Sequence, residues 1–155
     1  FFSRYYAWLH GRWPAGRVEK LPEVNADGTT AVPGVRVVGD LTGVPLLKFA
    51  ADSGARAARA VAEELGADRA GEEAGEGPAD LAIVGGGVAG IAAALEAKRL
   101  GLRFVVFEAA QPFATIANFP KAKPIFTYPT EFRHAGDLAL SAEVKEDLFA
   151  ELEAQ

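Results

Sequence analysis

The chain has 155 residues, of which 50% are hydrophobic and 24% are charged, and its formal net charge is −5. This length and balance indicate about one globular domain that can bury a core of its own. The chain contains no Cys and two His, which excludes disulfides, thiolate iron–sulfur clusters, a CxxC redox pair and a histidine-rich metal site. An acidic pI of about 5.1 argues against nucleic acid as a partner.

Two features of the sequence bear on where the protein acts. No apolar run approaches the ~20 residues that span a bilayer, and the first residues, FFSRYYAWLHGRW, do not resemble a signal peptide. We therefore expect a cytoplasmic protein without a membrane partner. Because the chain begins at Phe1 and contains no Met, we expect it to be an internal piece of a longer protein.

The first half of the chain contains a turn-rich segment, a short strand and a helix of small residues. Residues 1–34 begin with aromatic side chains and continue with frequent Pro and Gly, which break any long element. Residues 35–38 predict a short strand that ends at a Gly-Asp pair. Over residues 46–65, small apolar side chains recur every three or four positions, which predicts a helix packed unusually close to a sheet or a ligand. Residues 66–79, rich in Gly, Ala and acidic side chains, predict a linker.

The clearest pattern is a strand–helix–strand unit in the second half of the chain. Residues 81–84 and 104–107 predict two buried strands, and residues 88–100 predict the helix between them. Such a unit is right-handed and its strands are parallel. Residues 109–140 predict a loop, and an amphipathic terminal helix is predicted to begin with Ser141 as its N-cap.

The turn between the first of these strands and the helix, GGGVAG, has the spacing G-x-G-x-x-G. Gly85 permits the sharp turn, Gly87 lets the backbone approach a pyrophosphate, and Gly90 lets helix and strand pack closely. The N–H groups at the start of the helix, including those of Val88 and Ala89, lie at the positive end of the helix dipole and would hold the anion.

Glu108 ends the second strand, at the distance from the turn that suits a ribose-binding carboxylate. There it would accept hydrogen bonds from a ribose 2′-OH and repel a 2′-phosphate. These residues serve NAD and FAD equally well. A plain glycine turn that binds no ligand is the alternative.

Three further segments resemble motifs of the flavoproteins with two dinucleotide-binding domains, the class of thioredoxin reductase and glutathione reductase. Residues 30–40, TAVPGVRVVGD, resemble the second flavin motif of that class, in which the Asp bonds a ribityl hydroxyl of FAD. The small residues around Ala50 resemble the helix whose N-terminus faces the flavin pyrimidine. Residues 115–120, TIANFP, resemble the flavin-side loop, where the Asn lies near the ring system.

The resemblance implies an α/β fold: a Rossmann-type FAD/NAD(P)-binding three-layer domain with a parallel sheet. Residues 35–65 and 80–155 would together form one FAD-binding domain. The cofactor would do the chemistry, so that no side chain acts as a catalyst and no metal is needed. Beside the glycine turn and Glu108, the resemblance implies as cofactor-binding residues Gly39, Asp40, Ala50, Ser53, Gly54, Thr115 and Asn118. If the two halves share a site, residues 35–38 should lie in the same parallel sheet as residues 81–84, and the small side chains of Ala50, Ala51 and Gly54 should leave room for the ring.

The sequence also departs from this family. The Gly-Asp pair precedes the glycine turn, whereas the family has the opposite order. Either the parent protein is circularly permuted, which we favour, or the chain straddles two halves of a longer protein. No second G-x-G-x-x-G is present, and the absence of CxxC excludes dithiol exchange.

The resemblance is therefore to cysteine-free, thioredoxin reductase-like members, which pass electrons from NADPH through FAD to another centre. We expect FAD as cofactor and NAD(P)H as the electron donor of the parent protein. The partners would be a nicotinamide-binding domain or continuing chain, and a redox partner protein. Two alternatives remain: a non-catalytic module that binds NAD or ADP, and a fragment that binds nothing by itself.

Overall fold

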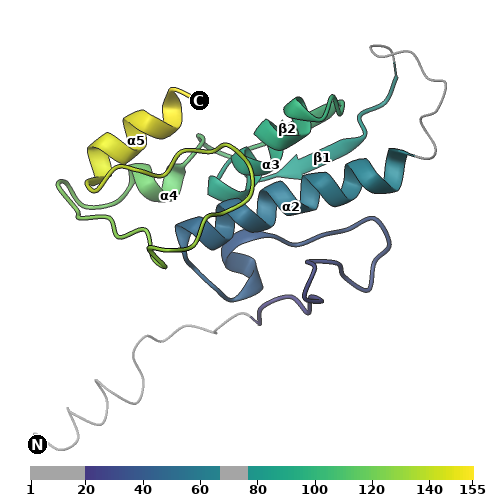
Figure 1. Ribbon diagram of the computed structural model, residues 1–155, viewed down its shortest axis with the longest axis horizontal. Helices are drawn as coiled ribbons and strands as arrows, with labels where there is room; N and C mark the ends of the chain where they lie inside the picture. The colour runs from purple at the N-terminus through teal and green to yellow at the C-terminus, as the bar shows by residue number, and fades with distance from the viewer. Residues whose placement is uncertain (1–19, 67–76) are drawn as a thin grey trace, which may run out of the picture.

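The structure is a computed structural model that describes residues 20–66 and 77–155 (Figure 1). Its centre is a strand–helix–strand unit. The strands β1 (Leu81–Val84) and β2 (Phe104–Phe107) pair in parallel, with Leu81 opposite Phe104 and Val84 opposite Phe107. The helix α3 (Val88–Arg99) connects them. Both predicted strands are confirmed residue for residue, because each is a short apolar run bounded by turn-forming or polar residues.

The two-stranded sheet is covered on one face. Ile83 is buried toward α3, whereas its neighbour Val84 is 87% exposed and Phe107, opposite Val84, is 56% exposed. Successive side chains of a strand point to opposite faces, so the outward face carries exposed apolar side chains. Over residues 20–66 and 77–155 the α/β fold therefore has helices on one side of the sheet. The expected three-layer arrangement is not present in this part of the chain.

A long helix, α2 (Leu47–Gly66), lies along α3 (Figure 1). Its buried face consists of small residues only: Ala50, Ala51, Gly54, Ala55 and Ala58. A Cβ built on Gly54 would stand 2.0 Å from the carbonyl oxygen of Ala89 in α3. This helix packs closely, as predicted, but its partner is the helix α3 and not the sheet or ligand that was expected.

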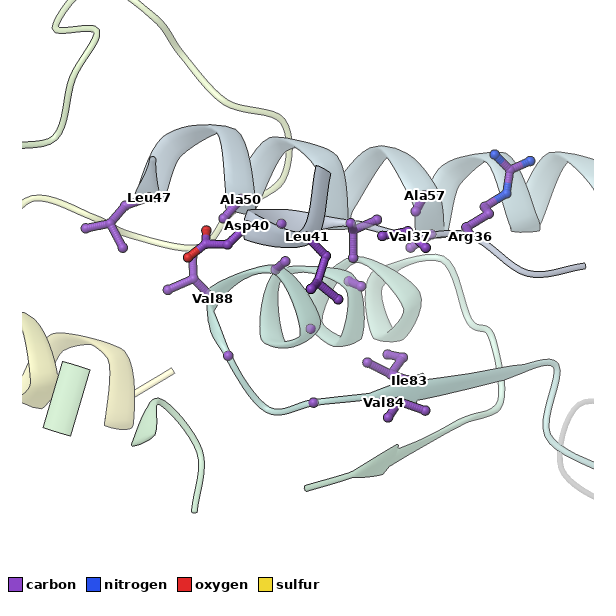
Figure 2. A pocket seen from close by; sticks show the side chains of 18 of the residues that line it. Arg36, Val37, Asp40, Leu41, Leu47, Ala50, Ala57, Ile83, Val84 and Val88 are labelled. Atoms are coloured by element: carbon purple, nitrogen blue, oxygen red, sulfur yellow. The ribbon is translucent and has the colours of Figure 1, made fainter. Parts of the chain in front are cut away.

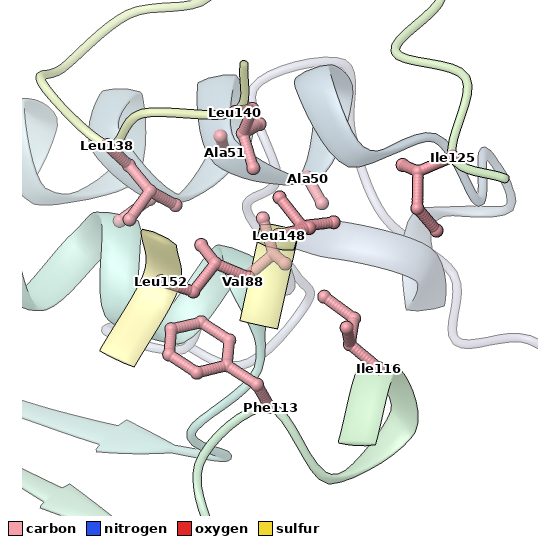
Figure 3. Close-up of a cluster of buried hydrophobic side chains, with 11 residues drawn as sticks. Ala50, Ala51, Val88, Phe113, Ile116, Ile125, Leu138, Leu140, Leu148 and Leu152 are labelled. Carbon is pink, nitrogen blue, oxygen red and sulfur yellow. The ribbon is translucent and has the colours of Figure 1, made fainter. Parts of the chain in front are cut away.

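The larger of two hydrophobic clusters lies where α2 and α3 begin (Figure 3). The short helix α4 (Ala114–Ala117) and the terminal helix α5 (Lys145–Glu153) close it from the other side. Its buried members include Ala50, Val88, Phe113, Ile116, Ile125, Leu138, Leu148 and Leu152. The smaller cluster lies between α3 and the sheet and contains Ile83, Ala93, Ala97 and Leu102.

Residues 35–38 do not form the predicted strand. The backbone there turns back on itself: Thr30 N–H donates to Val35 O at 3.2 Å, and Val37 N–H donates to Gly28 O at 2.8 Å. The result is one isolated antiparallel bridge between Thr29 and Arg36, followed by a short 3₁₀ helix, η1 (Gly39–Thr42). The expectation that residues 35–38 share a sheet with β1 is therefore wrong, because their hydrogen bonds are used locally.

The start of the terminal helix also differs from the prediction. Val144, not Ser141, occupies the N-cap of α5, while the N–H and the hydroxyl of Ser141 donate to the carboxylate of Glu151. Of the predicted linker, residues 67–76 lie outside the described residues, as does the aromatic segment 1–19. None of the described helices combines the length and the apolar character needed to cross a bilayer.

Candidate functional site

A pocket of about 1210 Å³ opens where the two halves of the described chain meet (Figure 2). Residues 34–41 and α2, from Leu47 to Leu65, form one wall. β1 and the glycine turn form another, and residues 113–126 contribute a third. Pockets for drug-sized molecules occupy about 300–1,000 Å³. This pocket therefore has room for a dinucleotide.

The glycine turn has three distinct backbone environments. Gly85 has φ +102°, a conformation that side chains rarely adopt. A Cβ on Gly90 would stand 1.9 Å from the carbonyl oxygen of Gly85, so only glycine permits this contact of helix and strand. Gly87 differs from both, because a Cβ there would meet nothing within 4 Å and would enter the pocket that Gly87 lines.

Gly87 is also the N-cap of α3. The first N–H groups of a helix have no partner within the helix. Those of Gly87, Val88 and Ala89 form no hydrogen bond to any residue that the structure describes. The turn thus presents unpaired donors at the positive end of the α3 dipole, beside open space. This is the chemistry of an anion site.

The turn is held in place from both sides of the Gly86 peptide. Its N–H donates to the Glu108 carboxylate at 2.5 Å, and its carbonyl oxygen accepts the N–H of Phe113 at 2.8 Å. The other carboxylate oxygen of Glu108 accepts the N–H of Ala110 at 2.9 Å. The N–H group of Gly86, followed by that of Ala110, lowers the pKa of Glu108, which keeps this side chain anionic at neutral pH.

Glu108 therefore has a structural role that the sequence pattern did not reveal. It does not line the pocket itself but stands behind the glycine turn, at the end of β2. The sequence assigned it only to the ribose of a nucleotide.

The Gly-Asp pair packs directly against the glycine-turn helix. Gly39 has φ +71°, and a Cβ on it would stand 2.9 Å from the Cβ of Ala89. Its N–H donates to Ser53 Oγ at 2.9 Å, and Ser53 Oγ donates to Ala50 O at 3.0 Å. Asp40 follows at the pocket wall, and Figure 2 shows its carboxylate directed toward Val88 in the first turn of α3.

The structure thus brings together most of the predicted site residues. Those that line the pocket are Gly39, Asp40, Ala50, Gly85, Gly87, Val88, Ala89, Gly90 and Thr115. Ser53 does not line it but fixes the Gly39 turn through the hydrogen bond just described. Asn118 does not line it either and occupies the C-cap of α4.

Gly54 and Ala51 require a correction. Both were expected to leave room for a ring system. However, Gly54 packs against the Ala89 carbonyl, and Ala51 is fully buried in the core. In the first turns of α2, Leu47 and Ala50 line the pocket, whereas Ala51 and Gly54 do not. The small-residue face of the helix therefore serves helix packing first.

Only part of the third wall of the pocket was predicted, as the flavin-side loop at residues 115–120. It contains Phe119, Lys123, Ile125 and Phe126, with the ammonium group of Lys123 lying 3.6 Å from the centre of the Phe119 ring. These residues belong to a segment without helical or strand periodicity. For Lys123, Ile125 and Phe126, which follow the predicted loop, the frequent aromatic side chains of the segment were the available signal.

Comparison with known proteins finds a similarity over part of the chain. No curated protein and no solved structure is significantly similar to the chain. Residues 82–153 do match a family model. The match begins in β1, includes the glycine turn, Glu108 and the third pocket wall, and ends with α5. In this part the chain is similar to the pyridine nucleotide-disulphide oxidoreductases, a family of flavin-dependent oxidoreductases.

Proposed function

We propose that this chain forms the FAD-binding site of an oxidoreductase that passes electrons from NAD(P)H through FAD to a further acceptor. One observation carries the proposal. The Gly39–Asp40 turn and the Gly85–Gly90 turn, far apart in the sequence, line one pocket and touch through Gly39 and Ala89. The family match covers the glycine turn but not the Gly-Asp pair, so the two sources of support are separate.

The residues of the pocket suit the parts of FAD. The free N–H groups at Gly87 and Val88 would bind the pyrophosphate, because a helix N-terminus favours an anion. The Asp40 carboxylate would accept a hydrogen bond from a ribityl hydroxyl. Glu108 does not line the pocket but holds the glycine turn, and from there it would accept a hydrogen bond from the adenosine ribose. When bound, FAD would supply the capacity to accept and release electrons. The chain itself would bind, orient and electrostatically support the cofactor without a catalytic side chain.

Gly87 offers a direct test. We expect Gly87→Val to abolish retention of FAD, because the new side chain enters the pocket at the start of α3. Gly66→Val is the matched control, since a Cβ on Gly66 also meets nothing within 4 Å and Gly66 does not line the pocket. The measurement is the visible flavin absorption that remains after FAD-loaded protein is passed through a desalting column.

Each outcome of this test has a defined meaning. The proposal predicts flavin absorption in the parent chain and in Gly66→Val, and its loss in Gly87→Val. A parent chain that retains ADP or NAD but no flavin would support the alternative of a non-catalytic nucleotide-binding module. Equal retention of FAD by all three proteins would show that the glycine turn does not hold the pyrophosphate.

A further inference from the structure

Phe126 is an exposed aromatic side chain at the pocket. It lines the pocket and is 66% exposed, while Ile125 before it is 7% exposed and belongs to the core cluster (Figure 3). A Phe side chain offers a large apolar area, which proteins usually bury. At Phe126, most of this area is exposed, and the residue borders the pocket.

The backbone that carries Phe126 is fixed by the start of α5. Ile125 N–H donates to Glu143 O at 2.8 Å, and Lys145 N–H donates to Lys123 O at 3.0 Å. Pro124 and Val144 form an isolated antiparallel bridge. With Ile125 anchored in the core, the direction of the next side chain is fixed as well.

The aromatic ring of Tyr128 supports Phe126 from beside it. The two ring centroids are 6.0 Å apart and the ring planes differ by 17°. The residues after Tyr128 are attached to the first turn of α2, because Lys48 Nζ donates to Pro129 O at 2.8 Å and to Thr130 O at 3.0 Å. Phe126 is thus held at the end of the pocket where α2 begins.

We propose that Phe126 provides the stacking surface for the isoalloxazine ring of FAD and that Lys48 is a positioning residue that holds this surface in place. The proposal rests on the proposed function. Asp40 lies between the glycine turn and the start of α2, so a cofactor whose pyrophosphate sits at Gly87 and whose ribityl chain passes Asp40 carries its ring toward the start of α2. Phe126 lines the pocket at that end, with one side supported by Tyr128.

The test compares FAD with ADP, which has the pyrophosphate and the adenosine but no flavin ring. We expect Phe126→Ala to weaken FAD binding about 2- to 10-fold, the range that an aromatic stacking contact contributes, and to leave ADP binding unchanged. Phe126→Tyr should restore the affinity for FAD. Lys48→Met should weaken FAD binding in the same direction and to a smaller extent. Dissociation constants are measured by equilibrium titration of the 155-residue chain.

Phe107→Ala is the control, because Phe107 is an exposed Phe on the outward face of the sheet that does not line the pocket; it should bind both ligands like the parent. Unchanged FAD binding by Phe126→Ala, or equal weakening of FAD and ADP, would overturn the ring contact while the proposed function stands. A parent chain that binds neither ligand would overturn the proposed function and the ring contact together.

Discussion

Two glycines of α2 have opposite surroundings. A Cβ on Gly54 would stand 2.0 Å from the carbonyl oxygen of Ala89 and 2.9 Å from its carbonyl carbon, whereas a Cβ on Gly66, the last residue of the same helix, would meet nothing within 4 Å. Backbone atoms cannot move aside as the end of a flexible side chain can. Gly54 therefore sets how closely α2 and α3 approach, and Gly66 does not.

We expect Gly54→Ala to lower the free energy of unfolding by about 1–3 kcal/mol or more, because the added methyl group must push the helices apart and this overpacking exceeds the gain in helix propensity. Gly66→Ala should remain within about 0.5 kcal/mol of the parent. Urea denaturation followed by circular dichroism measures both. Equal stability of the two variants would contradict the close contact of α2 and α3.

At the scale of elements, α2 and α3 are also joined by a buried carboxylate. Glu96 of α3 is 1% exposed and accepts hydrogen bonds from Arg59 of α2 at 2.6 Å and from Arg99 of its own helix at 2.5 Å. The hydrogen bond from Arg99, together with that from Arg59, lowers the pKa of Glu96, while burial opposes this shift. The ionised form is therefore the one that stabilises the helix pair.

Glu96→Gln should lower the free energy of unfolding at pH 7 by about 1.5–3 kcal/mol, the usual contribution of a hydrogen bond to a charged group. Because the folded-state pKa is lowered, the stabilisation is fully present above the unfolded pKa of about 4.3 and is lost as the pH falls through the folded value. The difference between parent and variant should thus shrink in acid. Urea titrations at pH 7 and below pH ~4 measure it; a difference that grows in acid would refute the assigned charge.

Elements that depend on local sequence were predicted correctly, whereas elements that depend on contacts with other segments were not. β1 and β2 were predicted residue for residue, because apolar runs bounded by turns specify strands locally. Residues 35–38 are also rich in Val, but Pro33 and Gly34 turn the chain so that the segment forms hydrogen bonds with its own neighbours. Ser141 is a good N-cap by type, yet Glu151 attracts both of its donors.

Some residues of the candidate site could be predicted from the sequence and others could not, for the same reason. The glycine turn was found because the fixed spacing of its glycines reports the backbone geometry, and the Gly-Asp pair was found through its resemblance to a flavoprotein motif. Phe126 was missed because its place depends on how residues 123–125 pair with the start of α5. Gly54 was assigned to the ligand because a row of small residues does not tell which neighbour comes close.

For the molecule as a whole, we expect binding without efficient turnover. The sequence has one G-x-G-x-x-G, and we propose that this turn binds the pyrophosphate of FAD. The FAD-loaded chain should therefore oxidise NADH and NADPH very slowly, while dithionite should reduce the bound flavin completely. Anaerobic absorption spectroscopy records both reactions. Rapid turnover that saturates with NADPH would contradict the expectation that a nicotinamide-binding domain must be added.

The contact between Gly39 and Ala89 has a further consequence for local stability. Because the Gly39 turn rests on the first turn of α3, opening of the Gly39 segment would uncover the helix end that we propose binds the anion. A ligand that tightens this helix end therefore also protects residues 39–42 from local unfolding, and the two events share one coupling free energy. A change that stabilises residues 39–42 against local unfolding should therefore also increase the affinity of the glycine turn for its ligand.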